Sequence, residues 1–225
     1  MTTVKGPARF MRTITVIVVV LVIIGIVVVT RRALSLAGVI KTYVNPKFGA
    51  FDKGFGLHPV LTFVHIIPGA LFMILAPLQF IPKIRSRYLW FHRWSGRVLV
   101  VVGLIIGISA LIMSFTMAIG GANETAATTV FAILFLVSLI KGFYHIRRRE
   151  VALHREWMIR MFAIGLAIAS VRPIVGMFFA FSKLSPHEFF GIAFWLGFTI
   201  QLMVAEIWIN YTRPRRVQSG SGIQP

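Results

Sequence analysis

Six apolar runs, each long enough to cross a bilayer, constrain the fold of this chain more than any other feature. A hydrocarbon core of roughly 30 Å needs about 20 apolar residues in a helix. Because lipid offers no partner for backbone N–H and C=O groups, such runs must pair their own backbone. The sequence therefore predicts an all-α, polytopic membrane helix bundle with six transmembrane helices, near residues 10–30, 58–82, 94–119, 125–146, 154–181 and 188–211.

These runs fill most of the chain and predict a single transmembrane domain, residues 1–216. The last residues, 217–225, are polar and rich in Ser and Gly, so we predict a disordered tail. The longest loop, residues 35–57, contains Gly and aromatic residues, and we predict a short helix at the membrane surface there. The absence of Cys excludes disulfides, thiolate nucleophiles and Cys-ligated metal centres.

The formal charge of +18 is unusually high, and its distribution predicts an orientation. Most of the 24 Lys and Arg lie on the side of the predicted bundle that carries both chain ends. Loops rich in Lys and Arg stay on the cytoplasmic side, so we predict that both termini are cytoplasmic. Because these residues cluster at the ends of apolar runs, anionic lipid is the expected partner and nucleic acid is not.

An internal repeat is visible when the chain is aligned with itself at an offset of 62 residues. His92-Arg93 then falls on His154-Arg155, and two small residues, Gly103 and Gly107, fall on Gly165 and Ala169. Small residues let membrane helices approach closely. We therefore predict that helices two to five form a duplicated core of two hairpins, in which the third and fifth helices are close together.

Two segments, Phe91 to Arg97 and Leu153 to Arg160, contain the repeated His-Arg pairs. Together with Leu78 to Phe80, Arg172 and Ala205-Glu206, they resemble the motifs of a bacterial membrane-protein family, domain of unknown function 2306. The resemblance implies a bacterial cytoplasmic membrane and gives no function. The histidines at helix ends, with Leu57 to Pro59, are more distantly similar to the four-helix core of cytochrome b561-type haem proteins.

The two repeated histidines are candidate cofactor ligands. His92 and His154 open the third and fifth helices at one depth, and two facing imidazoles are what a bis-histidine haem b needs. Arg93 and Arg155 follow them at helix N-termini, which favour an anion such as a haem propionate or a lipid phosphate. His145 lies at the same end of the fourth helix and is an alternative axial ligand. The alternative interpretation is that these side chains simply extend to the lipid headgroups.

An intramembrane arginine marks a second candidate site. Arg172 lies about 27 Å along its helix from His154 at 1.5 Å per residue, which places it in the outer half of the bilayer. A charge there costs about 2.5–3.5 kcal/mol or more unless it is paired or hydrated. His65 lies at a similar depth, so we predict an outer polar cavity that takes a quinone headgroup or a transported solute. Alternatively, Arg172 binds a carbonyl freed by Pro173.

Glu206 is the carboxylate placed deepest in a predicted helix. Its depth matches that of Arg97 and Arg160, so we predict a structural ion pair with one of them that holds the sixth helix to the core. The leading functional hypothesis is a small redox module that holds haem b and a quinone. The alternatives are an accessory or lipid-binding subunit of a larger membrane complex, and a transporter of small solutes.

Overall fold

The computed structural model describes residues 8–38 and 54–213, and these residues form helices without any strand. All except α4 are long and apolar enough to span a membrane, which confirms the predicted fold of six transmembrane helices. The predicted surface helix of the longest loop lies largely outside the described residues, and the predicted tail lies wholly outside them. The helices are α1 (Ala8–Leu36), α3 (Pro59–Leu78), α4 (Pro82–Arg87), α5 (Leu89–Thr116), α6 (Gly121–Arg147), α7 (Val151–Phe181) and α8 (Pro186–Thr212).

The helix boundaries differ from the apolar runs where the chain meets the membrane surface. α3 ends before Pro82, which lacks a backbone N–H and opens α4 at the first helical turn. α5 begins at Leu89, ahead of the predicted start, and Trp90 and Trp94 stack at 6.3 Å between ring centroids on its exposed face. α1 continues past Arg32 to Leu36. Charged residues at the surface therefore extend the helices beyond the apolar runs.

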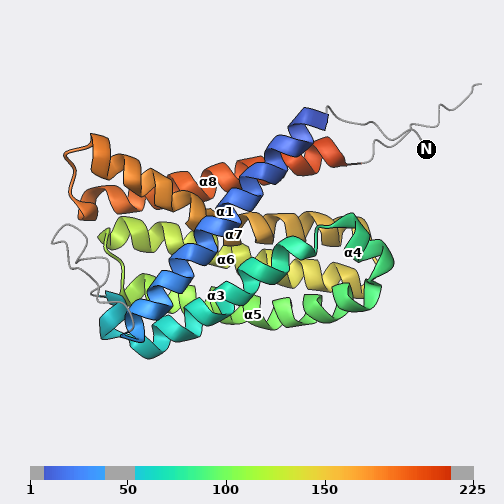
Figure 1. Cartoon of the computed structure of the whole chain (residues 1–225), viewed down its shortest axis with the longest axis horizontal. Coiled ribbons are helices and arrows are strands. Elements are labelled where there is room, and N and C mark those ends of the chain that lie inside the picture. The colour runs from blue at the N-terminus through green and yellow to red at the C-terminus, as the bar shows by residue number, and fades with distance from the viewer. Residues whose placement is uncertain (1–7, 39–53, 214–225) are drawn as a thin grey trace, which may run out of the picture.

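The six long helices form one bundle (Figure 1), in which α6, α7 and α8 pack against one another. α5 packs against both α3 and α6, and α1 crosses obliquely over α3 and α7. α1 begins, and α8 ends, at the end of the bundle that carries α4. We call this the inner end, after the predicted orientation, and the opposite end the outer end.

Aromatic side chains fill the middle of the bundle. Phe72 of α3 lies 6.0 Å from Phe135 of α6 and 6.3 Å from Phe162 of α7, measured between ring centroids. All three are nearly inaccessible to solvent. By contrast, α1 leaves apolar residues such as Val20 and Ile23 about half exposed. Exposed apolar surface is expected on helices that face lipid.

The predicted close contact between the third and fifth helices, now α5 and α7, is wrong. These two are not among the pairs of described helices that pack together. The small residues of α5 instead receive α6 side chains, because Gly103 lies against Leu139 and Gly107 against Leu136. Gly165 of α7 lies against Phe72 of α3. Since the matched glycines have different partners, the internal repeat stays a prediction.

Candidate functional site

A cavity of about 240 Å³ lies in the outer half of the bundle, between α5 and α7. Three of the four small residues predicted to bring these helices together, Gly107, Gly165 and Ala169, line it instead. Most of its wall is apolar, while its polar groups come from five of the long helices. These polar lining residues are Arg32 of α1, His65 of α3, Ser114 of α5, Glu124 and Thr128 of α6, and Arg172 of α7.

Arg172 contributes a cationic side chain to this cavity. Its Nε atom is buried and has no hydrogen-bond partner among the described residues. Among the described residues, the charged groups near enough to act on it are Arg32 and Glu124, and neither forms a described salt bridge with it. No hydrogen bond joins it to a carbonyl near Pro173 in the described part of the chain. Arg172 Nε is therefore a donor that the described part of the chain leaves unsatisfied.

Glu124 is a cavity residue that the sequence analysis missed. It lies in the first turn of α6 and is only 8% exposed. Its Oε2 accepts hydrogen bonds from the backbone N–H groups of Ile119 at 2.7 Å and Gly120 at 2.6 Å. From sequence alone, an acidic residue next to a turn is most simply interpreted as a helix cap, and Glu124 does bond the backbone N–H groups before its helix. The available signal was its position as a carboxylate at the same end of the bundle as Arg172.

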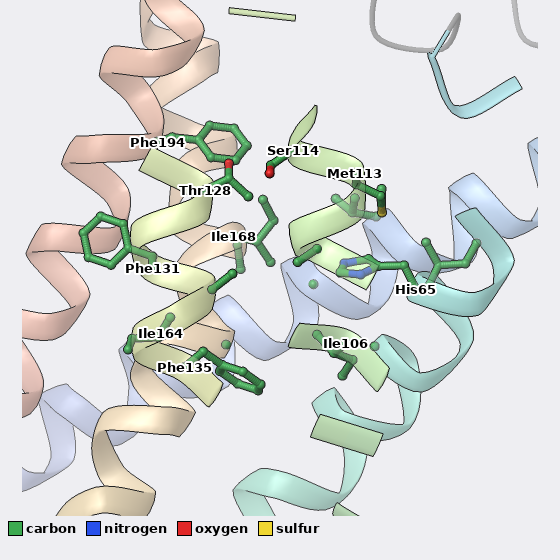
Figure 2. Close-up of a pocket in the computed structure, with 18 of the residues that line it drawn as sticks. His65, Ile106, Met113, Ser114, Thr128, Phe131, Phe135, Ile164, Ile168 and Phe194 are labelled. Atoms are coloured by element: carbon green, nitrogen blue, oxygen red, sulfur yellow. The ribbon is translucent and has the colours of Figure 1, made fainter. Parts of the chain in front are cut away.

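His65 lies on the opposite side of the polar region, on α3. Its Nδ1 is 2.9 Å from Ser109 Oγ on α5, and Figure 2 shows its imidazole at the wall of the cavity. Ser109 Oγ also lies 2.6 Å from the carbonyl oxygen of Ile105. Ser170, two residues before Arg172 on α7, instead accepts a 2.6 Å hydrogen bond from Gln201 of α8. The structure therefore places His65 and Arg172 on one cavity and turns Ser170 toward α8.

Aromatic rings form the wall beside α6 and α8, as Figure 2 shows for Phe131, Phe135 and Phe194. Phe131 stacks on Phe198 with 4.9 Å between ring centroids. Its other neighbour is Trp195, at 5.6 Å, whose indole N–H donates to Asn123 at 3.0 Å. The cavity thus combines aromatic side chains with a few polar groups, which is typical of ligand sites.

The predicted haem ligands lie at the inner end, and neither lines the outer cavity. His154 Nδ1 is 2.8 Å from the carbonyl oxygen of Gly142, whereas His92 Nδ1 is buried and unpaired among the described residues. The two histidines lie within electrostatic range of each other. His145 Nδ1 forms a hydrogen bond with Glu150 Oε2, so this nitrogen already has a partner. No group of three or more metal-ligating side chains is found in the described ranges.

The remaining predicted inner residues divide into exposed and paired ones. Arg93 and Arg97 are exposed on α5. Arg155 donates to Thr212 at 2.6 Å, and Arg160 donates to both Glu206 oxygens, with Nη2 to Oε2 at 2.9 Å. A second ion pair joins Arg213, which follows the last residue of α8, to Glu156 of α7 at 2.8 Å. The Glu156 carboxylate raises the pKa of the Arg213 guanidinium. The structure thus places Glu206 with Arg160 and away from α5.

A comparison with known families gives one match. The model of a family described as "Predicted membrane protein (DUF2306)" matches residues 62–209. This stretch runs from the first turn of α3 almost to the end of α8, and so includes both polar regions described above. No curated protein and no solved structure gives a match.

Proposed function

This chain belongs to the DUF2306 family of predicted membrane proteins, and we propose that it binds a lipophilic quinone-type molecule in the outer cavity. The headgroup of the ligand lies against the aromatic wall and contacts Arg172 and His65. The volume of about 240 Å³ lies just below the range of roughly 300–1,000 Å³ that is typical of small-molecule sites. The cavity therefore suits one headgroup, with the remainder of a longer ligand outside it.

The observation that carries this proposal is the unpaired Nε of Arg172. A cationic side chain in the hydrocarbon region costs about 2.5–3.5 kcal/mol or more, and such residues are usually paired. A buried donor without a partner adds about 1–3 kcal/mol. An oxygen atom of a bound ligand removes this second cost, so a ligand with an acceptor oxygen and an apolar body is favoured at this position.

Tryptophan fluorescence offers a direct test because quinones quench nearby indoles. Trp195 contacts Phe131, which lines the cavity, whereas Trp90, Trp94 and Trp157 lie toward the inner end. Titrating a decyl-substituted benzoquinone into protein in nanodiscs should give saturable quenching above that of a free indole in the same lipid. The variant Trp195→Phe should lose that component, and Trp157→Phe should keep it. Unsaturable quenching that is equal in both variants refutes quinone binding here.

Haem b at the inner end is a second candidate, favoured by one observation. The hydrogen bond from His154 Nδ1 to the Gly142 carbonyl leaves Nε2 as the free nitrogen, which is the usual arrangement of a metal-ligating histidine. Such a haem would supply one-electron redox chemistry. Purified protein should then take up haemin and show a Soret band that is lost in His92→Ala and His154→Ala. A spectrum without that band after reconstitution refutes the candidate.

The other functional alternatives have less support. Transport predicts a polar path from the cavity toward Glu206, but residues 161–164 of α7, between Arg160 and the cavity, are buried and apolar. The aromatic cluster of Phe72, Phe135 and Phe162 lies in the same region. An accessory role in a larger complex and specific binding of anionic lipids stay predictions.

A further inference from the structure

The hydrogen bonds of Ser109 determine which nitrogen of His65 carries a proton. Ser109 Oγ lies 2.6 Å from the Ile105 carbonyl oxygen, and two oxygens that close must share a hydrogen. A serine hydroxyl has only one hydrogen, and the Ile105 carbonyl has none to give. Ser109 therefore donates to Ile105, in the back-bond that serines commonly make within a helix.

The proton between His65 and Ser109 must consequently come from the imidazole. Their 2.9 Å contact is a hydrogen bond from His65 Nδ1–H to the Ser109 oxygen. In a neutral imidazole the other nitrogen, Nε2, then carries a lone pair and accepts. No described residue donates to Nε2, and the ring lines the cavity (Figure 2). His65 therefore offers the cavity an acceptor.

Two cavity residues thus have opposite hydrogen-bonding roles. Arg172 can only donate, whereas His65 in this tautomer can only accept at Nε2. A benzoquinone presents two carbonyl oxygens, both acceptors, so one of them meets the lone pair of His65. A benzoquinol presents two hydroxyl groups, each of which donates and accepts. The quinol therefore satisfies both residues, and the quinone satisfies only Arg172.

We propose that the cavity prefers the reduced, hydroxyl-bearing form of its ligand because His65 accepts a hydrogen bond from a ligand hydroxyl at Nε2. This inference rests on the proposed function and names the ligand form that the site selects. His65 is a positioning residue in this proposal, and no electron transfer is implied. Leaving a buried acceptor without its donor weakens binding by at least about fivefold.

Isothermal titration calorimetry under argon tests this preference for the quinol directly. Decyl-benzoquinol and decyl-benzoquinone are each titrated into protein in nanodiscs, with empty nanodiscs as the reference for partition into lipid. The expected result is a dissociation constant at least fivefold lower for the quinol. A quinone that binds as tightly as the quinol overturns this inference and leaves the proposed function intact. Titrations equal to empty nanodiscs for both ligands overturn both.

Two variants and one spectroscopic measurement sharpen the test. In His65→Gln the side-chain amide can rotate to donate or accept, so the preference should fall to within twofold while both forms still bind. Ser170→Ala, a matched control that bonds α8 instead, should keep the wild-type preference. Independently of either variant, ¹⁵N spectra of histidine-labelled protein should show an unprotonated Nε2 for His65. A protonated Nε2 refutes the inference.

Discussion

Replacing Arg172 with Met separates a ligand-binding role from a structural one. Met keeps an unbranched apolar stem and carries no charge, and the surrounding wall of the cavity is largely apolar. If Arg172 is present for a ligand, the protein without ligand gains stability when the charge is removed. If Arg172 holds the helices together, the same change destabilises the protein.

The magnitude follows from the environment of the guanidinium. Removing a buried, unpaired donor recovers about 1–3 kcal/mol, and more for a charged group. We therefore expect the variant without ligand to unfold with a free energy about 1–3 kcal/mol above that of the wild type. For a chain of this length each kcal/mol shifts the melting temperature by about 2–4 °C. With quinol at about 100 times its dissociation constant, the wild type gains about 2.7 kcal/mol and the variant does not.

Thermal unfolding in nanodiscs, with and without decyl-benzoquinol, measures both effects. The matched control is Arg160→Met on the same helix, because Arg160 donates to both oxygens of Glu206. That variant removes the described partner of Glu206, whose side chain is 42% exposed, and should melt below the wild type, by about 0.5–1 kcal/mol in unfolding free energy. The two arginine variants therefore shift the melting temperature in opposite directions in the absence of ligand. A lower melting temperature for Arg172→Met than for the wild type would refute the reasoning.

Three further predictions concern the same cavity. Glu124→Gln weakens the hydrogen bonds that Glu124 accepts from Ile119 and Gly120, so thermal unfolding should show that the free energy of unfolding falls by about 1–2 kcal/mol. Ile168→Trp enlarges a side chain that Figure 2 shows at the cavity, so calorimetry should find quinol affinity reduced about tenfold or more, whereas an unchanged affinity places the ligand elsewhere. A tenfold preference for quinol raises the midpoint potential of the bound couple by about 30 mV, which redox titration in nanodiscs measures against empty nanodiscs.

The number of helices could be predicted because the bilayer sets a minimum length for an apolar run. Their partners could not, because a small residue permits a close approach without specifying which helix approaches. Gly107 is an example, since it receives Leu136 of α6 and its helix faces α7 across a cavity. A pattern of small residues indicates positions where either a neighbouring helix packs closely or a cavity forms. The tertiary arrangement decides which of the two occurs.

Depth along the membrane was predictable, whereas direction around each helix was not. A rise of 1.5 Å per residue places His65 and Arg172 at one level, and the structure has both at one cavity. The same count places Glu206 level with both Arg97 and Arg160. Only the packing of α7 against α8 decides that Arg160 is the partner and that Arg97 is exposed.

Several charged groups at the inner end have carboxylate partners, whereas Arg172 Nε at the outer end has no described partner. This contrast supports the proposed site at the outer end. At the inner end, Arg160 bonds Glu206 and Arg213 bonds Glu156, so these groups stabilise the packing of α7 against α8. At the outer end, the Glu124 carboxylate is engaged by backbone N–H groups, and Arg172 Nε is unpaired among the described residues. Because a charge in the membrane is costly unless it is paired, the proposed ligand would explain the position of Arg172, whose Nε has no partner among the described residues.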